Sequence, residues 1–430
     1  MTLVILIVAL VALICIRMPV ALALFTVSLS YILLGGSGST RIALQQSIGG
    51  IDSFPLLAVP FFVLLGYLAT AAGISERLFT MADALIGRVR AGLGYVNVTS
   101  SLMFSMMNGS ALADTASLGR ILIPDMVKRG YGSRFSLGLT AASSLVGPML
   151  PPSVPAILYA VTAGVSVAGL FAASLLPALL IAALMCVAVF VYGQSMARRG
   201  VDLRTERRYT RREVGRTSLV SIPALLTPVV LLGGIFGGLF TPTEAACVAA
   251  VYLFVVGMAQ RAFTRDKLWE VFRGTASTTA SIMITIAAAG LYGWILTREG
   301  AGLLVSDLVA SIGDNPVLFL LVVNIVMLVL GMVLDAAPAI LILVPILIPS
   351  VELLGIDPLH FGVIVVLNLM IGLMTPPVGM LLFVLRQTTG YSFRETLLGV
   401  LPFLGILVAG LLVLTYVPLL STALPGLLGH

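Results

Sequence analysis

The residues of this chain that are most able to do chemistry are polar and lie inside apolar sequence. The stretch FSMMNGSALADTASLG (residues 104–119) places hydroxyl groups, an amide and the Asp114 carboxylate between apolar flanks. Ionisable residues buried in apolar surroundings are energetically expensive and are usually functional, so Asp114 is a candidate site residue. A structural role is the alternative, in which Asp114 caps the following helix or pairs with Arg120.

A second stretch, LGMVLDAAPAILILVP (residues 330–345), contains Gly331 and Asp335 but far fewer hydroxyl groups. Asp114 and Asp335 lie 221 residues apart, and we interpret them as corresponding residues in two halves of the chain. An acid–base pair of an intramembrane enzyme is an alternative. The chain has 2 histidines and lacks HExxH, GxSxG and GxxxxGK[ST] motifs, so we predict that it is not an enzyme.

Two proline pairs interrupt apolar segments at matching places. GPMLPPSV (residues 147–154) resembles GLMTPPVG (residues 372–379), and Pro151 and Pro376 lie 225 residues apart. A bend relieved by a neighbouring helix would explain one such pair. Two pairs at equivalent positions, each following a stretch with a polar turn, favour functional breaks in two helices.

Each proline pair is expected to change the backbone chemistry of its helix. Pro151 and Pro376 lack an N–H donor, so they should leave the carbonyl groups of Gly147 and Gly372 unpaired. Each broken helix then presents a carbonyl end and an N–H end in apolar surroundings. Carbonyl and hydroxyl oxygens suit a hard cation such as Na⁺, and helix N-termini suit a carboxylate.

Composition identifies the elements that must position these residues as membrane helices. The chain has 430 residues, of which 59% are hydrophobic and 10% charged, and its mean hydropathy is +1.14. A soluble domain has about 25% charged residues. The first segment, MTLVILIVALVALICI, has no basic n-region, so we expect a retained helix and not a signal peptide. The three cysteines, Cys15, Cys186 and Cys247, are interpreted as packing residues.

The basic residues predict the topology, and the net charge of +6 is not interpreted as nucleic-acid affinity. Eight arginines lie in residues 198–216, so we predict a cytoplasmic basic loop over residues 198–217. Arg17 is also assigned to the cytoplasmic side. With this assignment both termini are periplasmic. The predicted crossing segments are residues 1–16, 19–36, 55–74, 134–163, 166–193, 219–236, 243–259, 276–296, 359–389 and 396–420.

The predicted fold class is an all-α polytopic membrane protein with two inverted-topology repeats, residues 1–197 and 218–430. Each repeat contains a re-entrant helical hairpin (residues 95–128 and 315–350) and a proline-broken transmembrane helix (residues 134–163 and 359–389). Inverted repeats with discontinuous helices are typical of secondary transporters, whose sites lie near the bilayer midplane. In LFTPTEAA (residues 239–246), Glu244 is interpreted as part of a capped helix start, with Thr241 or Thr243 as the cap.

At these residues the chain resembles the large membrane subunit, DctM type, of tripartite ATP-independent periplasmic (TRAP) transporters. The matching stretches are NGSALADTASLGRILIPDM, GPMLPPSVP, FTPTEAA and GIDPLHFGVIVVLNLMIGLMTPPVG, which together span nearly the whole chain. The resemblance implies an elevator-type, Na⁺-coupled importer in the bacterial inner membrane, with no cofactor beyond the coupling ion. It also implies a periplasmic binding protein that delivers an organic acid, such as a dicarboxylate, a keto acid or sialic acid.

The resemblance implies specific site residues as well. The first ion site would use Ser105, Asn108, Gly147, Leu150 and Pro152, and the second Gly331, Gly372, Thr375 and Val378. Asn108 departs from the family, which more often has Ser there. The substrate would lie between the hairpin tips, near Asn108, Gly109, Ser110, Asp114, Pro151, Asp335, Pro376 and Pro377.

The resemblance further implies a partner subunit. A small four-helix membrane subunit completes the scaffold in this family, and nothing in these 430 residues corresponds to it, so a separate chain is expected. The alternative is a related ion-coupled organic-anion carrier with the same two-hairpin architecture that works alone, without a binding protein or a partner subunit.

Overall fold

The structure is a computed structural model that describes residues 2–16, 18–34, 39–203, 209–311 and 314–429. Within these ranges every regular element is a helix, as predicted. Part of the predicted basic loop, residues 204–208, lies outside the described residues, and so do Arg17 and the side chain of Cys15. The side chains of Cys186 and Cys247 are free thiols that are half-buried among the helices.

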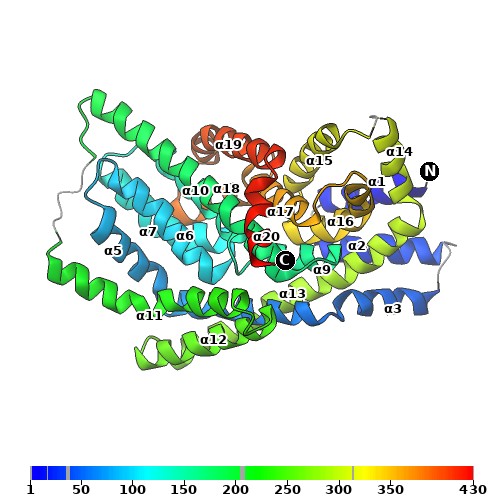
Figure 1. Cartoon of the computed structure of the whole chain (residues 1–430), viewed down its shortest axis with the longest axis horizontal. Coiled ribbons are helices and arrows are strands. Elements are labelled where there is room, and N and C mark those ends of the chain that lie inside the picture. Colours follow the sequence, from blue (N-terminus) through cyan, green and yellow to red (C-terminus); the bar gives the residue numbers. More distant parts are fainter. Residues whose placement is uncertain (1, 17, 35–38, 204–208, 312–313, 430) are drawn as a thin grey trace.

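The first half of the chain contains a helical hairpin and a broken helix at the predicted places (Figure 1). In chain order its elements are α1 (Thr2–Cys15), α2 (Val20–Leu33), α3 (Thr40–Ile51), the 3₁₀ helix η1 (Phe54–Leu57), α4 (Ala58–Ala71), α5 (Ile74–Ile86), α6 (Gly92–Asn108), α7 (Ala111–Lys128), α8 (Ser133–Ser144), the 3₁₀ helix η2 (Gly147–Met149), α9 (Val154–Ala163) and α10 (Val167–Arg198). The hairpin is α6–α7, and the broken helix is α8 followed by α9.

The second half also has a helical hairpin that is followed by a broken helix and a long helix. Its helices are α11 (Arg211–Phe236), α12 (Pro242–Ala259), α13 (Arg265–Arg298), α14 (Ala301–Ser311), α15 (Pro316–Gly331), α16 (Ala336–Leu353), α17 (Pro358–Met374), α18 (Met380–Thr389), α19 (Phe393–Tyr416) and α20 (Leu419–Leu428). The hairpin is α15–α16, and the broken helix is α17 followed by α18. The peptide bond between the two prolines of each break is cis.

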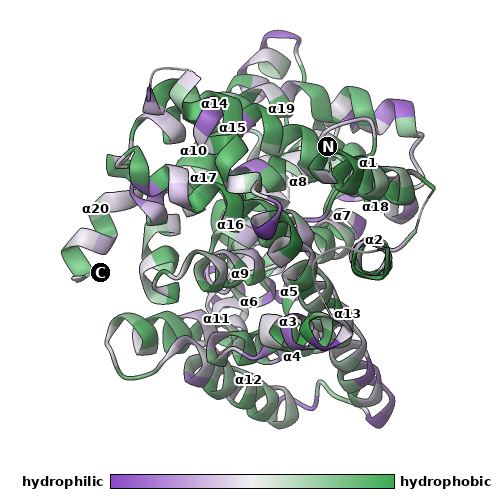
Figure 2. Ribbon diagram, turned by 90° about the vertical axis from the view of Figure 1, so that its right-hand side faces the viewer, coloured by the Kyte–Doolittle hydropathy of each residue, from purple (hydrophilic) through white to green (hydrophobic). Residues whose placement is uncertain are grey.

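The described helices suit a lipid environment. Seven of them are long and apolar enough to cross a membrane, or eight if α8 and α9, which are bent by 42° at their break, form one span. Hydrophobic residues cover most helices along their length (Figure 2). Because lipid cannot satisfy free backbone groups, helices are the expected solution. The chain is therefore a multi-pass membrane protein.

Short polar side chains set where several helices begin. Thr241 is the N-cap of α12, where its hydroxyl accepts a hydrogen bond from the N–H of Glu244 at 3.3 Å. The Glu244 carboxylate in turn accepts the N–H of Thr241 at 2.8 Å, which completes a capping box. The predicted capped start at this segment is confirmed, with Thr241 as the cap.

The structure differs from the predicted elements in four places. The predicted loop 198–217 is too long, because a second capping box, formed by Thr210 and Glu213, starts α11 at Arg211. The helix predicted over residues 276–296 begins earlier, at Arg265. The predicted final span 396–420 ends at Tyr416 and is followed by the separate helix α20. Helices α3 and α14 were not predicted, and α3 begins at a Ser39 N-cap.

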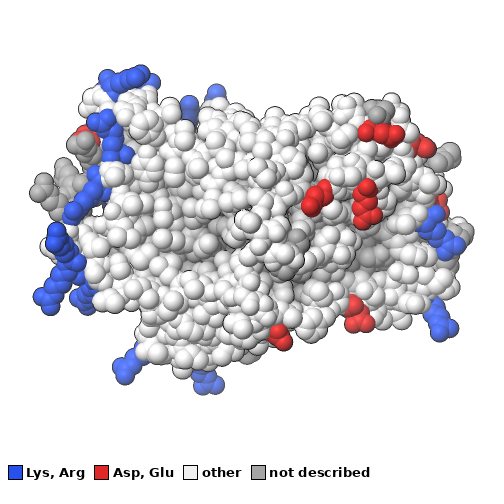
Figure 3. Space-filling view, in the orientation of Figure 1, with Lys and Arg blue, Asp and Glu red and all other residues white. Residues whose placement is uncertain are grey.

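Each hairpin packs against the broken helix of the other half of the chain. Helix α7 of the first hairpin packs against α18, and α16 of the second hairpin packs against α9. Helices α3, α4, α11, α12 and α13 pack against one another along one side of the molecule (Figure 1). On the face in view, Lys and Arg gather at the end where α5, α10 and α11 lie, and most Asp and Glu lie toward the other end (Figure 3).

Candidate functional site

The tip of the first hairpin packs against the break between α8 and α9. Ser105, near the end of α6, is fully buried and faces Gly147, where an added Cβ would lie 2.7 Å from the Ser105 hydroxyl oxygen. Gly109 at the tip has a φ of +61°, and a side chain there would collide with the carbonyl oxygen of Pro152. Of the residues predicted for the first ion site, Ser105 and Gly147 are therefore in contact, and the Pro152 carbonyl contacts the hairpin tip at Gly109.

The second hairpin approaches α17 in the same way. A Cβ added to Gly372 would lie 2.6 Å from the Cα of Gly331, so only glycine allows this approach. Thr375 ends α17, and its hydroxyl donates to the carbonyl oxygen of Ile371 at 2.7 Å. Val378 lies within the break and is 37% exposed. Gly331, Gly372 and Thr375, all predicted for the second ion site, therefore lie together.

The carbonyl groups predicted to be unpaired do accept hydrogen bonds. The Gly147 carbonyl accepts the N–H of Leu150 at 3.1 Å, and the Gly372 carbonyl accepts the N–H of Thr375 at 2.9 Å. The prediction was wrong because the chain tightens into a 3₁₀-type turn at each break, which supplies a donor three residues later. A carbonyl oxygen has two lone pairs, so each can still accept a ligand.

Amide side chains fasten each hairpin to its broken helix. The Ser143 hydroxyl on α8 donates to the Asn97 amide oxygen on α6 at 2.9 Å. The Asn368 amide on α17 donates to the Asn324 amide oxygen on α15 at 2.8 Å. All four side chains are buried. Such bonds between membrane helices contribute about 1 kcal/mol each, and here they hold corresponding helix pairs in register.

Asp114 has neither of the structural roles considered for it. The N-cap of α7 is Ser110, whose hydroxyl accepts the N–H of Ala113 at 3.4 Å. Asp114 has no ion-pair partner among the described residues, so it does not pair with Arg120. Its side chain is 1% exposed, and neither carboxylate oxygen makes a hydrogen bond. This carboxylate is therefore buried without a partner.

The correspondence predicted between Asp114 and Asp335 is wrong. Asp335 is the N-cap of α16 and accepts the N–H of Ala336 at 2.8 Å, so it takes the position that Ser110 has in the first hairpin. Four residues after each cap, Asp114 and Ala339 donate their N–H to the cap carbonyl at 3.0 and 3.3 Å. Ser110 and Asp335 are 225 residues apart, the spacing of the proline pairs, and the buried Asp114 corresponds to an alanine.

A cavity of about 980 Å³ lies between the two hairpin tips and helices α4 and α13. The first turns of α7, α9 and α16 all line it. Helix N-termini carry partial positive charge and free N–H groups, so three of them around one cavity favour an anion. Helix α13 adds the hydroxyl groups of Ser277, Thr278 and Ser281 to the opposite wall.

The cavity contains half of the predicted substrate residues. Those that line it are Asn108, Gly109, Ser110 and Asp335. Those that do not are Asp114, Pro151, Pro376 and Pro377. Asn108 also touches α4, because a Cβ on Gly66 would lie 2.6 Å from its amide oxygen.

Arg120 lines the cavity, although the sequence had suggested only a pairing with Asp114. It is exposed on α7 and is the one Lys or Arg among the described residues that line the cavity. The acidic residues of that lining are Glu76 and Asp335. The signal in the sequence was an arginine within a hairpin that was predicted to lie in the membrane. Its position makes it a candidate contact for an anionic group.

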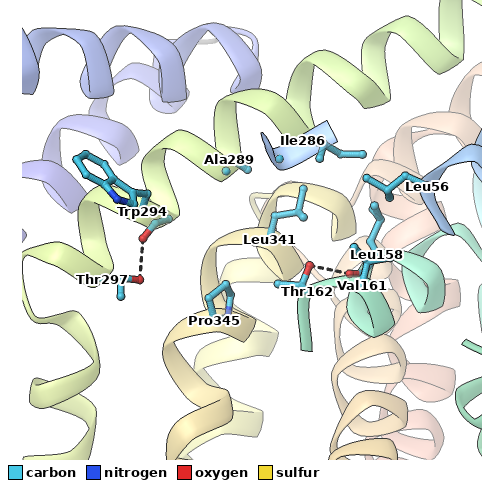
Figure 4. A pocket seen from close by; sticks show the side chains of 13 residues that line it. Leu56, Leu158, Val161, Thr162, Ile286, Ala289, Trp294, Thr297, Leu341 and Pro345 are labelled. Carbon is cyan, nitrogen blue, oxygen red and sulfur yellow. Dashed lines mark hydrogen bonds between the residues drawn. The ribbon is translucent and has the colours of Figure 1, made fainter. Parts of the chain in front are cut away.

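A smaller crevice of about 240 Å³ lies beside the cavity (Figure 4). Leu158 of α9 lines both the cavity and the crevice. Leu341 of α16 and Ile286 of α13 line the crevice only. The two hydroxyl groups in view, on Thr162 and Thr297, donate to carbonyl oxygens of their own helices at 2.7 and 2.9 Å. The crevice is therefore mainly apolar.

Known proteins resemble this chain over most of its length. It is 41% identical to the sialic acid TRAP transporter large permease protein SiaM of Vibrio cholerae, over 95% of both chains. It is 37% identical to the C4-dicarboxylate TRAP transporter large permease protein DctM of Pseudomonas aeruginosa, over 93% of this chain and 92% of that one. These relatives are permease subunits, so the enzyme alternative is excluded.

Structure and sequence-family comparisons agree with this result. The crystal structure of the Alcanivorax borkumensis YdaH transporter matches 92% of this chain and 95% of that chain, with a TM-score of 0.65 and 15% identity, and shares the fold. Residues 7–420 match the family described as "Tripartite ATP-independent periplasmic transporter, DctM component". The chain belongs to the DctM component family of TRAP transporters and is one of its large permease subunits.

Proposed function

We propose that this permease imports an organic acid through the cavity between its hairpin tips. The observation that carries the proposal is the convergence of three helix N-termini on that cavity, which suits a carboxylate. Arg120 supplies a fixed positive charge, and the hydroxyl groups of α13 can bind further polar groups of the substrate. The relatives named for sialic acid and for C4-dicarboxylates support this class of substrate.

We further propose that the two halves are inverted repeats. The support comes from matched contacts: Ser105 with Gly147 corresponds to Gly331 with Gly372. The amide contacts of the two hairpins correspond as well. Each hairpin in this proposal re-enters the membrane from the side where it began.

Transport in this proposal is coupled to Na⁺ by an elevator mechanism. Hydroxyl and carbonyl oxygens gather where each hairpin meets its broken helix, and hard cations prefer such ligands. The remaining predicted ligands, Asn108, Leu150, Pro152 and Val378, complete the proposed sites. The hairpins and broken helices move as one unit against α4 and α13, which form the opposite wall of the cavity.

TRAP permeases work with a small membrane subunit and a periplasmic binding protein. We propose that here the small subunit is a separate chain and that the binding protein delivers the organic acid. The concentration of arginine at the ends of α10 and α11 supports a cytoplasmic position for that end of the molecule, in the inner membrane and with both termini in the periplasm.

Reconstitution tests this assembly. Proteoliposomes containing both membrane subunits are offered a C4-dicarboxylate, a keto acid and sialic acid, each with its binding protein present or absent. We expect uptake of one class of acid only when the binding protein and the small subunit are both present. Equal uptake by the large subunit alone would instead identify a stand-alone carrier.

A further inference from the structure

The buried Asp114 carboxylate has no positive partner among the residues that the structure describes. Its side chain is 1% exposed, and both of its oxygens lack a hydrogen bond. Transfer of an isolated charge into apolar surroundings is strongly unfavourable, and buried charges are normally paired or bound to a cation. A cation or a proton must therefore neutralise Asp114 during the transport cycle.

The surroundings of Asp114 favour a cation. The hydroxyl groups of Ser101 and Ser105 lie beside the carboxylate. The Ser105 hydroxyl is fully buried, has no partner of its own and faces Gly147. A proton would add a single donor to the carboxyl group, which is enough for a hydrogen bond to one acceptor only. A hard cation coordinates several oxygens at once, so it accounts for both groups.

We propose that Asp114 supplies the fixed negative charge of the first sodium site and does not bind the substrate. The site combines its carboxylate with the Ser105 hydroxyl and the free lone pair of the Gly147 carbonyl. This inference rests on the proposed Na⁺ coupling. It agrees with the absence of Asp114 from the residues that line the cavity.

The second hairpin has an alanine, Ala339, at the position of Asp114, so the two proposed sodium sites differ in charge. Gly331 takes the position of Ser105 in α15. The second site must therefore rely on backbone carbonyls and the Thr375 hydroxyl. Carboxylate ligands strengthen cation binding. Sodium binding in the absence of substrate consequently depends mainly on Asp114.

Thermal unfolding in the absence of substrate tests this inference. The purified pair of membrane subunits is heated at increasing NaCl concentration, with choline chloride keeping the ionic strength constant. A ligand that binds only the folded protein raises its melting temperature. We expect Na⁺ to stabilise the wild type, and Asp114→Asn to raise the half-maximal Na⁺ concentration by about tenfold or more.

Two further variants keep the test decisive. Asp335→Asn removes the carboxylate at the other hairpin tip and keeps a good N-cap, so its response to Na⁺ should equal that of the wild type. Ser105→Ala should weaken the response. In the double variant with Asp114→Asn, the loss of the Na⁺ response should be much smaller than the sum of the two single losses, because both groups bind the same ion.

Each contrary result has a distinct meaning. A wild-type Na⁺ response in Asp114→Asn, or equal weakening by Asp335→Asn, would overturn the assignment of Asp114 while Na⁺ coupling stood. Stabilisation of the wild type by acid, lost in Asp114→Asn, would identify a proton and overturn the sodium site. No response of the wild type to Na⁺ would overturn the proposed coupling as well.

Discussion

At the scale of residues, small side chains position the candidate site. Gly147 admits the Ser105 hydroxyl, and Gly372 admits the backbone of Gly331, so each hairpin reaches the backbone of a broken helix. Charged groups are few and differ in their surroundings. Asp114 is buried without a partner, whereas Arg120 is exposed to the cavity. The glycines set the distance between each hairpin and its broken helix, and the charged residues decide which ions the site can bind.

Gly147→Ala tests the close approach at the first site. The added Cβ would lie 2.7 Å from the Ser105 hydroxyl oxygen, a misfit that costs about 1–3 kcal/mol in a packed interior. We expect normal amounts in the membrane and Na⁺-dependent uptake reduced about tenfold. Gly405→Ala in α19 is the control, because nothing lies within 4 Å of its added Cβ. Equal uptake by both variants would contradict the proposed site.

Arg120→Gln tests the charge in the cavity. Loss of a charge-assisted contact to a carboxylate should raise the KM for the organic acid about tenfold while the response to Na⁺ stays the same. Arg120→Lys keeps the charge and should have an intermediate KM. Uptake kinetics in proteoliposomes over a range of substrate concentrations measure both. An unchanged KM in the glutamine variant would show that Arg120 does not contact the substrate.

At the scale of elements, the helix breaks at residues 150–153 and 375–379 position the candidate site. They aim the N-terminus of α9 at the cavity and hold Gly147 and Gly372 against the hairpins. Both were predictable from sequence, because prolines act locally on their own helix. The hairpins were predictable too, since polar turns interrupt apolar runs at their tips. The short helices α3, α14 and α20 were not predicted; their place depends on packing against α13, α16 and α10.

Removing the first helix break tests its role. Pro151→Ala with Pro152→Ala allows α8 to continue toward α9, which should remove the Pro152 carbonyl from its contact with Gly109. We expect normal insertion and uptake at least about tenfold lower, because small displacements of a site are costly. Pro177→Ala is the control, since α10 continues through that proline. Wild-type uptake in the double variant would mean that the break only bends the helix.

At the scale of the whole molecule, composition predicted a multi-pass membrane protein, and the orientation derived from charge stays a prediction. The isolation of Asp114, its correspondence to Ala339 and the position of Arg120 could not be predicted. They depend on which helix faces turn toward the cavity, and short polar segments do not determine this. The spacing of 221 residues between the two aspartates was misleading because Asp335 is the N-cap of α16, whereas Asp114 lies four residues after the N-cap of α7.

Cysteine labelling tests the orientation. In a variant without the three native cysteines, Asp202→Cys lies in the arginine-rich loop and Leu303→Cys, 72% exposed, lies on α14. We expect an impermeant thiol reagent added to whole cells with a permeabilised outer membrane to label position 303 but not 202. Labelling of position 202 alone would place the termini on the cytoplasmic side.

The coupling of transport to sodium is the central claim, and ion-gradient-driven uptake tests it most directly. Proteoliposomes containing both membrane subunits receive the loaded binding protein, with the Na⁺ gradient set independently of pH and membrane potential. We expect the organic acid to accumulate only with an inward Na⁺ gradient, and this accumulation to collapse when a sodium ionophore is added. Equal accumulation without Na⁺ would contradict the account.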